Sequence, residues 1–293
     1  MLESTFLDLA IYFEHRNYLP SVGVGVLGAA GLLKVRELAS RAAIPTGIAI
    51  AALCLLAWIS LQNARLWRQP LRLAEETVRT HPESRWALAN LGNRYLSVGR
   101  TDDAERLYVQ ASGRYPQALY PPLRRLAIQA CVRNEAVPAS LWQELEQHSR
   151  TGTPAGFDLP PELDRLLRVM QQGECRSIDP ERLLGLLEAL IENPNFSRER
   201  GLLHQLTTNL CMLRADLHCA LRHARAALNV YWSPDRQVQY VYVLLALRHA
   251  DQAAAAIVEL QAGLAAKPMT QLAYRLQLRE LQLRLNEVRT QRD

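Results

Sequence analysis

The pattern of apolar and polar residues divides the chain into a strongly apolar N-terminal part and a long part with helical periodicity. Residues 43–61 read AIPTGIAIAALCLLAWISL and carry no charge. As a helix rising roughly 1.5 Å per residue, this run would reach about 30 Å, the thickness of the hydrocarbon core of a bilayer. A helix buried in a soluble core usually has a polar stripe, and this run has none. We therefore expect a membrane span here.

A second apolar run, VGVGVLGAAGLL, lies just before it and is rich in glycine and alanine, which favour close helix contacts in lipid. Counted from Leu19, it predicts a span at about residues 19–33, with an interfacial or re-entrant segment as the alternative. The linker between the runs, residues 34–42, carries three basic residues and one acidic residue. The positive-inside rule places such a linker in the cytoplasm and the C-terminal part on the other side, although arginines after residue 61 favour the opposite orientation.

From about residue 69 the pattern changes to pairs of amphipathic helices. Residues 84–116 fit the 34-residue tetratricopeptide template, in which small residues let two helices approach and a glycine, here Gly99, makes the turn. The signature positions are Leu88, Leu91, Gly92, Tyr95, Ala104, Tyr108, Ala111 and Pro116.

The template recurs near the C-terminus with a weaker fit, since Thr208 and Tyr242 replace small residues of the first helices. The matching positions are Ala220, Ala224, Ala227 and Pro234 in one unit and Ala254 and Pro268 in the next. The last helix, expected at residues 270–291, has leucines such as Leu276 and Leu283 and a polar outer face, which suits a capping helix.

The region between the repeats is helical but out of register. Ser140 is expected to cap one helix, and Asp179 followed by Pro180 is expected to begin another. Residues 151–158, TGTPAGFD, predict a flexible loop. The chain is thus expected to comprise a membrane segment (1–68, with an interfacial helix at 1–18), a repeat unit with a preceding half unit (69–116), a degenerate helical region (117–200) and repeat-like pairs with a capping helix (201–293).

Composition supports an all-α fold, because helix-favouring residues dominate and there are only 14 glycines and 15 prolines among 293 residues. The net charge is +5, but the arginines alternate with acidic residues and form no clustered basic and aromatic face. Nucleic-acid binding is therefore not expected. The predicted fold class is all-α, with an N-terminal transmembrane hairpin followed by a tetratricopeptide-like α-solenoid of antiparallel helix pairs.

The cluster of Glu14, His15 and Arg16 lies beside the first apolar run. Ionisable residues next to a span are often functional, and a His–Arg pair can hold a lipid phosphate. Interfacial snorkelling and helix capping explain the same cluster equally well.

The run FEHRNYLPS, followed by a Gly/Val-rich segment, a second apolar segment, Trp67 and the repeats, resembles the C-terminal part of repeat-bearing GT-C-class membrane glycosyltransferases, including O-mannosyltransferases. The resemblance implies a bacterial inner-membrane protein with its C-terminal helical domain in the periplasm. It also implies a polyprenyl-phosphate lipid, with Glu14, His15 and Arg16 positioning the phosphate. The catalytic acid of that class lies upstream of this motif, so no catalytic residue is assigned and the chain is not expected to be an active enzyme alone.

The cysteines and histidines offer two kinds of site. Cys219 and His223 are four residues apart, with His204 and His218 near in sequence, but no second such pair completes a metal site, so neither metal nor cofactor is expected. Cys211 and Cys219 could face each other across a helical hairpin and form a disulfide. The four cysteines after residue 68 allow three full pairings, and the sequence does not choose among them.

The first helices of the repeats predict a binding face. Trp86, Asn90 and Asn93 project from one unit, and Gln205 and Asn209 project from another. Side-chain amides can pair with the backbone of an extended peptide, although a solvated helix surface would look the same. We expect a membrane-anchored repeat protein that binds a protein or glycan partner. The alternatives are a fragment or subunit of the glycosyltransferase and an assembly factor for an envelope or pilus machine.

Overall fold

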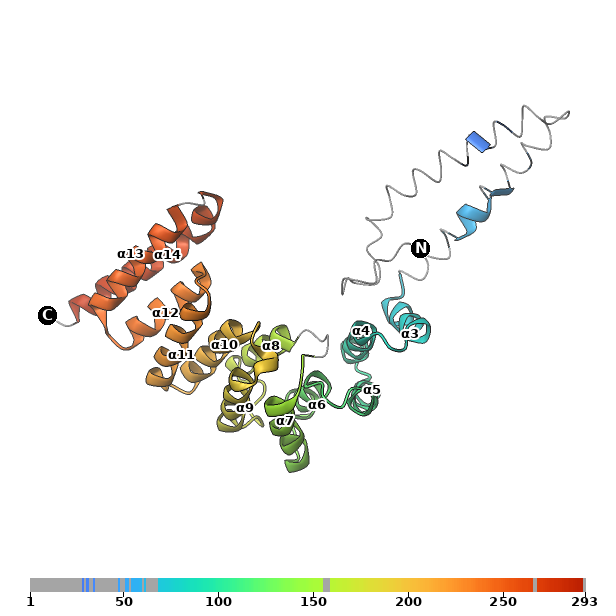
Figure 1. Ribbon diagram of the computed structural model, residues 1–293, viewed down its shortest axis with the longest axis horizontal. Helices are drawn as coiled ribbons and strands as arrows, with labels where there is room; N and C mark the ends of the chain where they lie inside the picture. Colours follow the sequence, from blue (N-terminus) through green and yellow to red (C-terminus); the bar gives the residue numbers. More distant parts are fainter. Residues whose placement is uncertain are drawn as a thin grey trace. The chain divides into compact units, whose positions relative to one another are not determined.

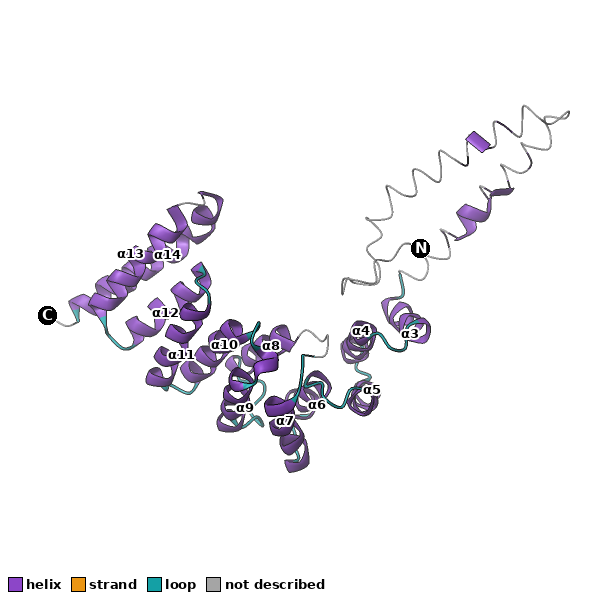
Figure 2. Ribbon diagram, viewed as in Figure 1, coloured by secondary structure: helices purple, strands orange, loops and turns teal. Residues whose placement is uncertain are grey.

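A computed structural model describes residues 68–154, 159–265 and 268–291, together with some positions between residues 28 and 61. Within these ranges the chain is helical, apart from turns, loops and one isolated bridge between Ala118 and Thr153 (Figure 2). This agrees with the all-α part of the predicted fold. The chain divides into two units, Met1–Arg100 and Thr101–Asp293.

The predicted transmembrane hairpin is not supported. No helix in the described part of the chain is long and apolar enough to cross a membrane. Even the longest, α14 (Pro268–Thr290), carries charged residues along its length. Residues 1–18, and most of 19–33 and 43–61, lie outside the described residues. The described helices therefore do not support the predictions of two inner-membrane spans and of a periplasmic domain that depended on them.

The first unit contains helices α3 (Pro70–Thr80) and α4 (Arg85–Ser97), which pack against each other. The Ser84 hydroxyl accepts a hydrogen bond from the backbone N–H of Ala87 and begins α4. Gly99, with a φ of 75°, ends it. The carboxylate of Glu75 on α3 accepts hydrogen bonds from Tyr95 and Arg100, which ties the end of α4 to its neighbour.

The second unit begins with five helices and a π-helical turn. They are α5 (Thr101–Arg114), α6 (Tyr120–Ala127), the π turn (Ile128–Val132), α7 (Ala139–Thr151), α8 (Leu159–Gln171) and α9 (Pro180–Glu192). One leucine-rich hydrophobic cluster runs through this region from Leu119 to Leu210. The predicted repeat unit 84–116 thus corresponds to α4 and α5, and the boundary between the two units falls at the turn between them.

Two predicted helix starts have different outcomes. Asp179 does cap α9, because its carboxylate accepts from the backbone N–H of Glu181 at 2.9 Å. Ser140 does not cap α7, which begins at Ala139 after Pro138, so the serine lies inside the first turn. The described end of the predicted loop at 151–158 is held in place: Gly152 accepts hydrogen bonds from two asparagine amides, Asn193 and Asn195.

An ion pair in the core links three helices of this region. Arg124 of α6 is 4% exposed and forms an ion pair with Glu162 of α8, while its Nε donates to the hydroxyl of Tyr108 on α5 at 3.4 Å. Burial raises the pKa of the Tyr108 hydroxyl, so this group stays neutral beside the guanidinium. The off-register region is therefore held by a polar contact as well as by leucines.

The C-terminal half is a row of helices in which each packs against the next (Figure 1). They are α10 (Arg200–Leu213), α11 (Leu217–Val230), α12 (Pro234–Ala246), α13 (Ala250–Ala265) and α14. The first helices α10, α12 and α14 begin 34 residues apart, and α12 packs against both of the others. This is the arrangement of stacked helical hairpins.

The hairpins share one turn geometry. Ala215 after α10 and Arg248 after α12 have φ angles of 57° and 58°. In each turn the next residue donates its N–H to the carbonyl five residues back, from Asp216 to Cys211 and from His249 to Leu244, both at 2.9 Å. This is the Schellman ending of a helix, which satisfies carbonyls that the helix leaves open.

The leucines of α14 are arranged differently from the prediction. Leu281 and Leu285 are buried against α12 and α13, whereas Leu276 and Leu283 are 77% and 63% exposed. The outer face of this helix is therefore not uniformly polar.

Candidate functional site

An amide cluster joins α10 to α12. Gln239 of α12 donates through Nε2 to the backbone carbonyl of Gln205 at 3.0 Å and to Oδ1 of Asn209 at 2.6 Å. All three residues are half-buried. The structure thus brings together the two residues predicted for this face and adds Gln239, which lies 34 residues after Gln205 and could have been found from the repeat spacing.

The cluster contains one unpaired acceptor beneath the surface. Gln239 Oε1 is buried and has no partner among the described residues. An amide oxygen in this state costs about 1–3 kcal/mol relative to a paired one. Because Oδ1 of Asn209 is occupied, the side chain turns its Nδ2 donors elsewhere. The carbonyl of Gln205 can only accept, so it fixes the Gln239 amide with Nε2 towards α10 and Oε1 pointing away from it.

The other predicted residues of the binding face lie in the first unit. Trp86 on α4 is 47% exposed, and Asn90 and Asn93 on the same helix are half-buried. They belong to Met1–Arg100, whereas the amide cluster belongs to Thr101–Asp293. Glu14, His15 and Arg16, predicted to position a lipid phosphate, lie outside the described residues.

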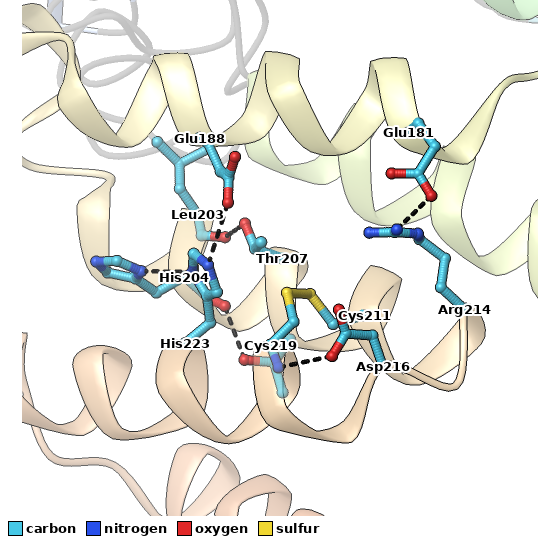
Figure 3. The surroundings of a disulfide bond; sticks show 11 residues. Glu181, Glu188, Leu203, His204, Thr207, Cys211, Arg214, Asp216, Cys219 and His223 are labelled. Carbon is cyan, nitrogen blue, oxygen red and sulfur yellow. Dashed lines mark hydrogen bonds and ion pairs between the residues drawn. A yellow bond between two sulfur atoms is a disulfide. The ribbon is translucent and has the colours of Figure 1, made fainter.

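The structure bonds Cys211 to Cys219 across the α10/α11 turn (Figure 3). The carboxylate of Asp216 caps α11 by accepting from the backbone N–H of Cys219 at 2.9 Å. A second disulfide, Cys131–Cys175, joins the π turn after α6 to the turn after α8. Of the three full pairings that the sequence allowed, the structure thus has Cys131 with Cys175 and Cys211 with Cys219. Since the sulfur of Cys219 is in a disulfide, Cys219 and His223 do not form a pair of metal ligands.

A histidine pair lies beside this disulfide (Figure 3). Nδ1 of His204 on α10 is 3.1 Å from Nδ1 of His223 on α11, and Nε2 of His223 is 3.8 Å from a carboxylate oxygen of Glu188 on α9. Burial lowers the pKa of His204 to about 4, and the positive charges of Arg200 and Arg236 add to this effect. Burial also lowers the pKa of His223. At neutral pH both rings are uncharged, and one donates to the other.

The next hairpin shows what these polar contacts replace. Val238 and Ile257 stand 34 residues after His204 and His223, and Leu245 and Ala253 stand 34 residues after Cys211 and Cys219. All four are buried in one hydrophobic cluster between α12 and α13. The α10/α11 hairpin therefore has a histidine pair and a disulfide at positions that are apolar in the α12/α13 hairpin.

The positive charge near His204 lies at one end of the amide face. Arg200 begins α10, and Arg236 lies in the first turn of α12 with its guanidinium donating to the carbonyls of Ala227 and Tyr231. The Arg236 guanidinium lies against Gly201, where an added Cβ would come within 2.7 Å of it. The first turns of α10 and α12 thus share a fixed cationic group.

No protein-family model and no curated protein matches the chain, so its resemblance to membrane glycosyltransferases stays a prediction.

Proposed function

We propose that the chain is a helical-repeat scaffold, of tetratricopeptide type, that binds an extended peptide segment of a partner protein along α10 and α12. The observation that carries the proposal is the amide cluster. Asn209 and Gln239 hold each other in place, yet Gln239 Oε1 has no partner among the described residues, and this buried oxygen becomes available to a ligand through a side-chain shift at the surface of the cluster. An extended backbone offers one N–H and one C=O at each residue, which is the complement of two adjacent amides.

The position of two positively charged side chains indicates what kind of peptide would bind. Arg200 and Arg236 act on His204 from the first turns of α10 and α12, where the helix dipoles are also positive. A carboxylate is favoured at that end of the face. The ligand expected is an extended segment with an acidic side chain, or a C-terminal carboxylate, a few residues from the part that contacts Asn209.

The test begins with a random peptide library selected on the purified protein, followed by titration of the best peptide by calorimetry. We expect the double variant Asn209→Ala/Gln239→Ala to weaken binding about 10- to 100-fold, because two hydrogen bonds of about 1 kcal/mol each are lost. N-methylation of the peptide backbone at the contact position should weaken binding to a similar extent. Asn229→Ala, which removes an exposed amide from α11, is the matched control and should change nothing.

Two results would overturn the proposal. One is a selection that enriches no peptide over background, including the case in which a parallel glycan array does show binding. The other is a peptide whose affinity is unchanged in the double variant while circular dichroism shows that the variant is folded.

A further inference from the structure

The outer face of α14 repeats a face that is covered elsewhere in the chain. Because α14 begins 34 residues after α12, their positions correspond one to one. On α12 the face against α13 is buried and comprises Gln237, Val238, Val241, Leu244 and Leu245. The corresponding residues of α14 are Gln271, Leu272, Arg275, Leu278 and Arg279.

This face of α14 is open. Together with Gln261 of α13 and Gln282 of α14, these five residues line a groove of about 420 Å³. Leu272 is 63% exposed, and Leu278 is half-buried against the α12/α13 cluster. Figure 1 shows α13 and α14 side by side at the C-terminal end of the row. Each of the two preceding first helices, α10 and α12, packs on this face against a second helix, and none of the described helices does so for α14.

Two substitutions in the register define what the groove accepts. Arg275 and Arg279 stand where α12 has Val241 and Leu245, so an apolar surface has gained two positive charges. The described residues that line the groove include no acidic side chain. The long stems of Arg275 and Arg279 can still pack on an apolar neighbour while their guanidinium groups reach the edge of the groove. An occupant must therefore offer apolar residues to Leu272 and Leu278 and carboxylates to the two arginines.

Helix α13 shows the shape of such an occupant. It covers α12 with small and branched residues about one turn apart: Ala250, Ala253, Ala256, Ile257 and Leu260. In the α10/α11 hairpin the disulfide and the histidine pair fix two contacts, Cys211 with Cys219 and His204 with His223. Shifted by two repeats of 34 residues, the contact of Cys211 with Cys219 places Arg279 against the counterpart of Ala253 in a bound helix. The contact of His204 with His223 places Leu272 against the counterpart of Ile257.

We propose that the open face of α14 binds an amphipathic helix of a partner protein, with an alanine- and leucine-rich stripe bordered by aspartate or glutamate. The bound helix completes a third hairpin. A second copy of α14 is disfavoured as the occupant, because it would bring the arginines of two chains together. The surface uses neither Asn209 nor Gln239, so it does not depend on the peptide face of α10 and α12.

The experiment uses a pair of stapled, N-acetylated peptides with the sequence of residues 250–265. One carries Ala253→Glu and Ala256→Glu, and the other is unchanged. Fluorescence anisotropy on the full chain should show at least tenfold tighter binding of the acidic peptide. The protein variant Arg275→Glu/Arg279→Glu should lose this binding and gain affinity for a peptide with lysines at the same two positions. That gain shows that the variant is folded.

A control on the same helix is Leu283→Ser, which removes an exposed leucine outside the groove and should leave binding unchanged. Leu272→Ser should weaken it severalfold. Equal affinity for the acidic and unchanged peptides would overturn the proposal. So would concentration-dependent dimerisation in sedimentation equilibrium that Leu272→Ser abolishes, because the occupant would then be a second copy. If Asn209→Ala/Gln239→Ala loses binding of the extended peptide to α10 and α12, that result has no bearing on the test of the α14 face.

Discussion

The histidine pair of α10/α11 is a polar substitute for an apolar contact, and its effect on stability depends on pH. The unfolded chain takes up protons at the ordinary histidine pKa of about 6.5. In the folded chain burial lowers the pKa of His204 to about 4. The folded state therefore binds fewer protons, its stability is full above about pH 6.5, and stability is lost as the pH falls towards 4.

The double substitution His204→Val/His223→Ile tests this effect, because it introduces the residues found at the same positions of the α12/α13 hairpin. We expect it to raise the free energy of unfolding at pH 7 by about 1 kcal/mol, because a pair of polar groups is exchanged for apolar groups of fitting shape. It should also flatten the decline between pH 6.5 and 4, measured by urea unfolding at several pH values. A variant whose acid limb is as steep as that of the parent would contradict this role.

Ala215 is a second residue with a measurable cost. It is exposed and has a φ of 57°, a conformation that L-residues rarely adopt. Ala215→Gly should stabilise the chain by about 0.5–1 kcal/mol, since glycine adopts this turn without strain, less the entropy that glycine adds to the unfolded state. The midpoint of thermal unfolding measures it.

The reverse change at Gly173 is its control. This residue has a φ of 79° with open space around it, so only the backbone is affected. Gly173→Ala should destabilise by about 1 kcal/mol. Destabilisation by Ala215→Gly, or stabilisation by Gly173→Ala, would mean that the turn concerned is not left-handed.

At the scale of elements, the disulfide in the α10/α11 turn holds two helices that the next hairpin holds by packing alone. Cys211→Ser/Cys219→Ser should lower the free energy of unfolding by about 2–3 kcal/mol, the chain-entropy value for so short a loop. Cys211→Leu/Cys219→Ala copies Leu245 and Ala253 and should recover a large part of this loss. Peptide mapping without reductant verifies the pairing, and urea unfolding measures the energies.

In the off-register region, the ion pair of Arg124 with Glu162 holds α6 and α8 together, as the disulfide holds α10 and α11. Arg124→Met should cost about 3 kcal/mol or more, because it leaves the carboxylate of Glu162 almost buried without a partner. Arg168→Met, which breaks an exposed pair with Asp164 on α8, should leave the unfolding midpoint nearly unchanged. Equal effects of the two variants would show that Glu162 is not confined in the core.

How far these elements could be predicted depends on sequence separation. The helix pairs of the C-terminal half follow from Ala220 and Ala254, because small residues recur wherever two helices approach. The contact of Gln239 with Asn209 follows from the same spacing. The ion pair of Arg124 and the disulfide of Cys131 join residues 38 and 44 apart in a region without a repeat, so no local pattern indicates them.

At the scale of the whole molecule, the 34-residue repeat gives each helix of the C-terminal half a reference copy. The comparison of α12 with α14 identifies the open face, and the comparison of α10 with α12 identifies the polar substitutions. The uncharged run at 43–61 led to a prediction of spans that the described helices do not support.

Hydrogen exchange, with and without the selected peptide, tests directly whether a peptide binds along α10 and α12. We expect slower exchange in α10 and α12, centred on Asn209 and Gln239, with little change in α6 to α8. Protection that is confined to other helices, or no protection at saturating peptide, would contradict peptide binding on the face of α10 and α12.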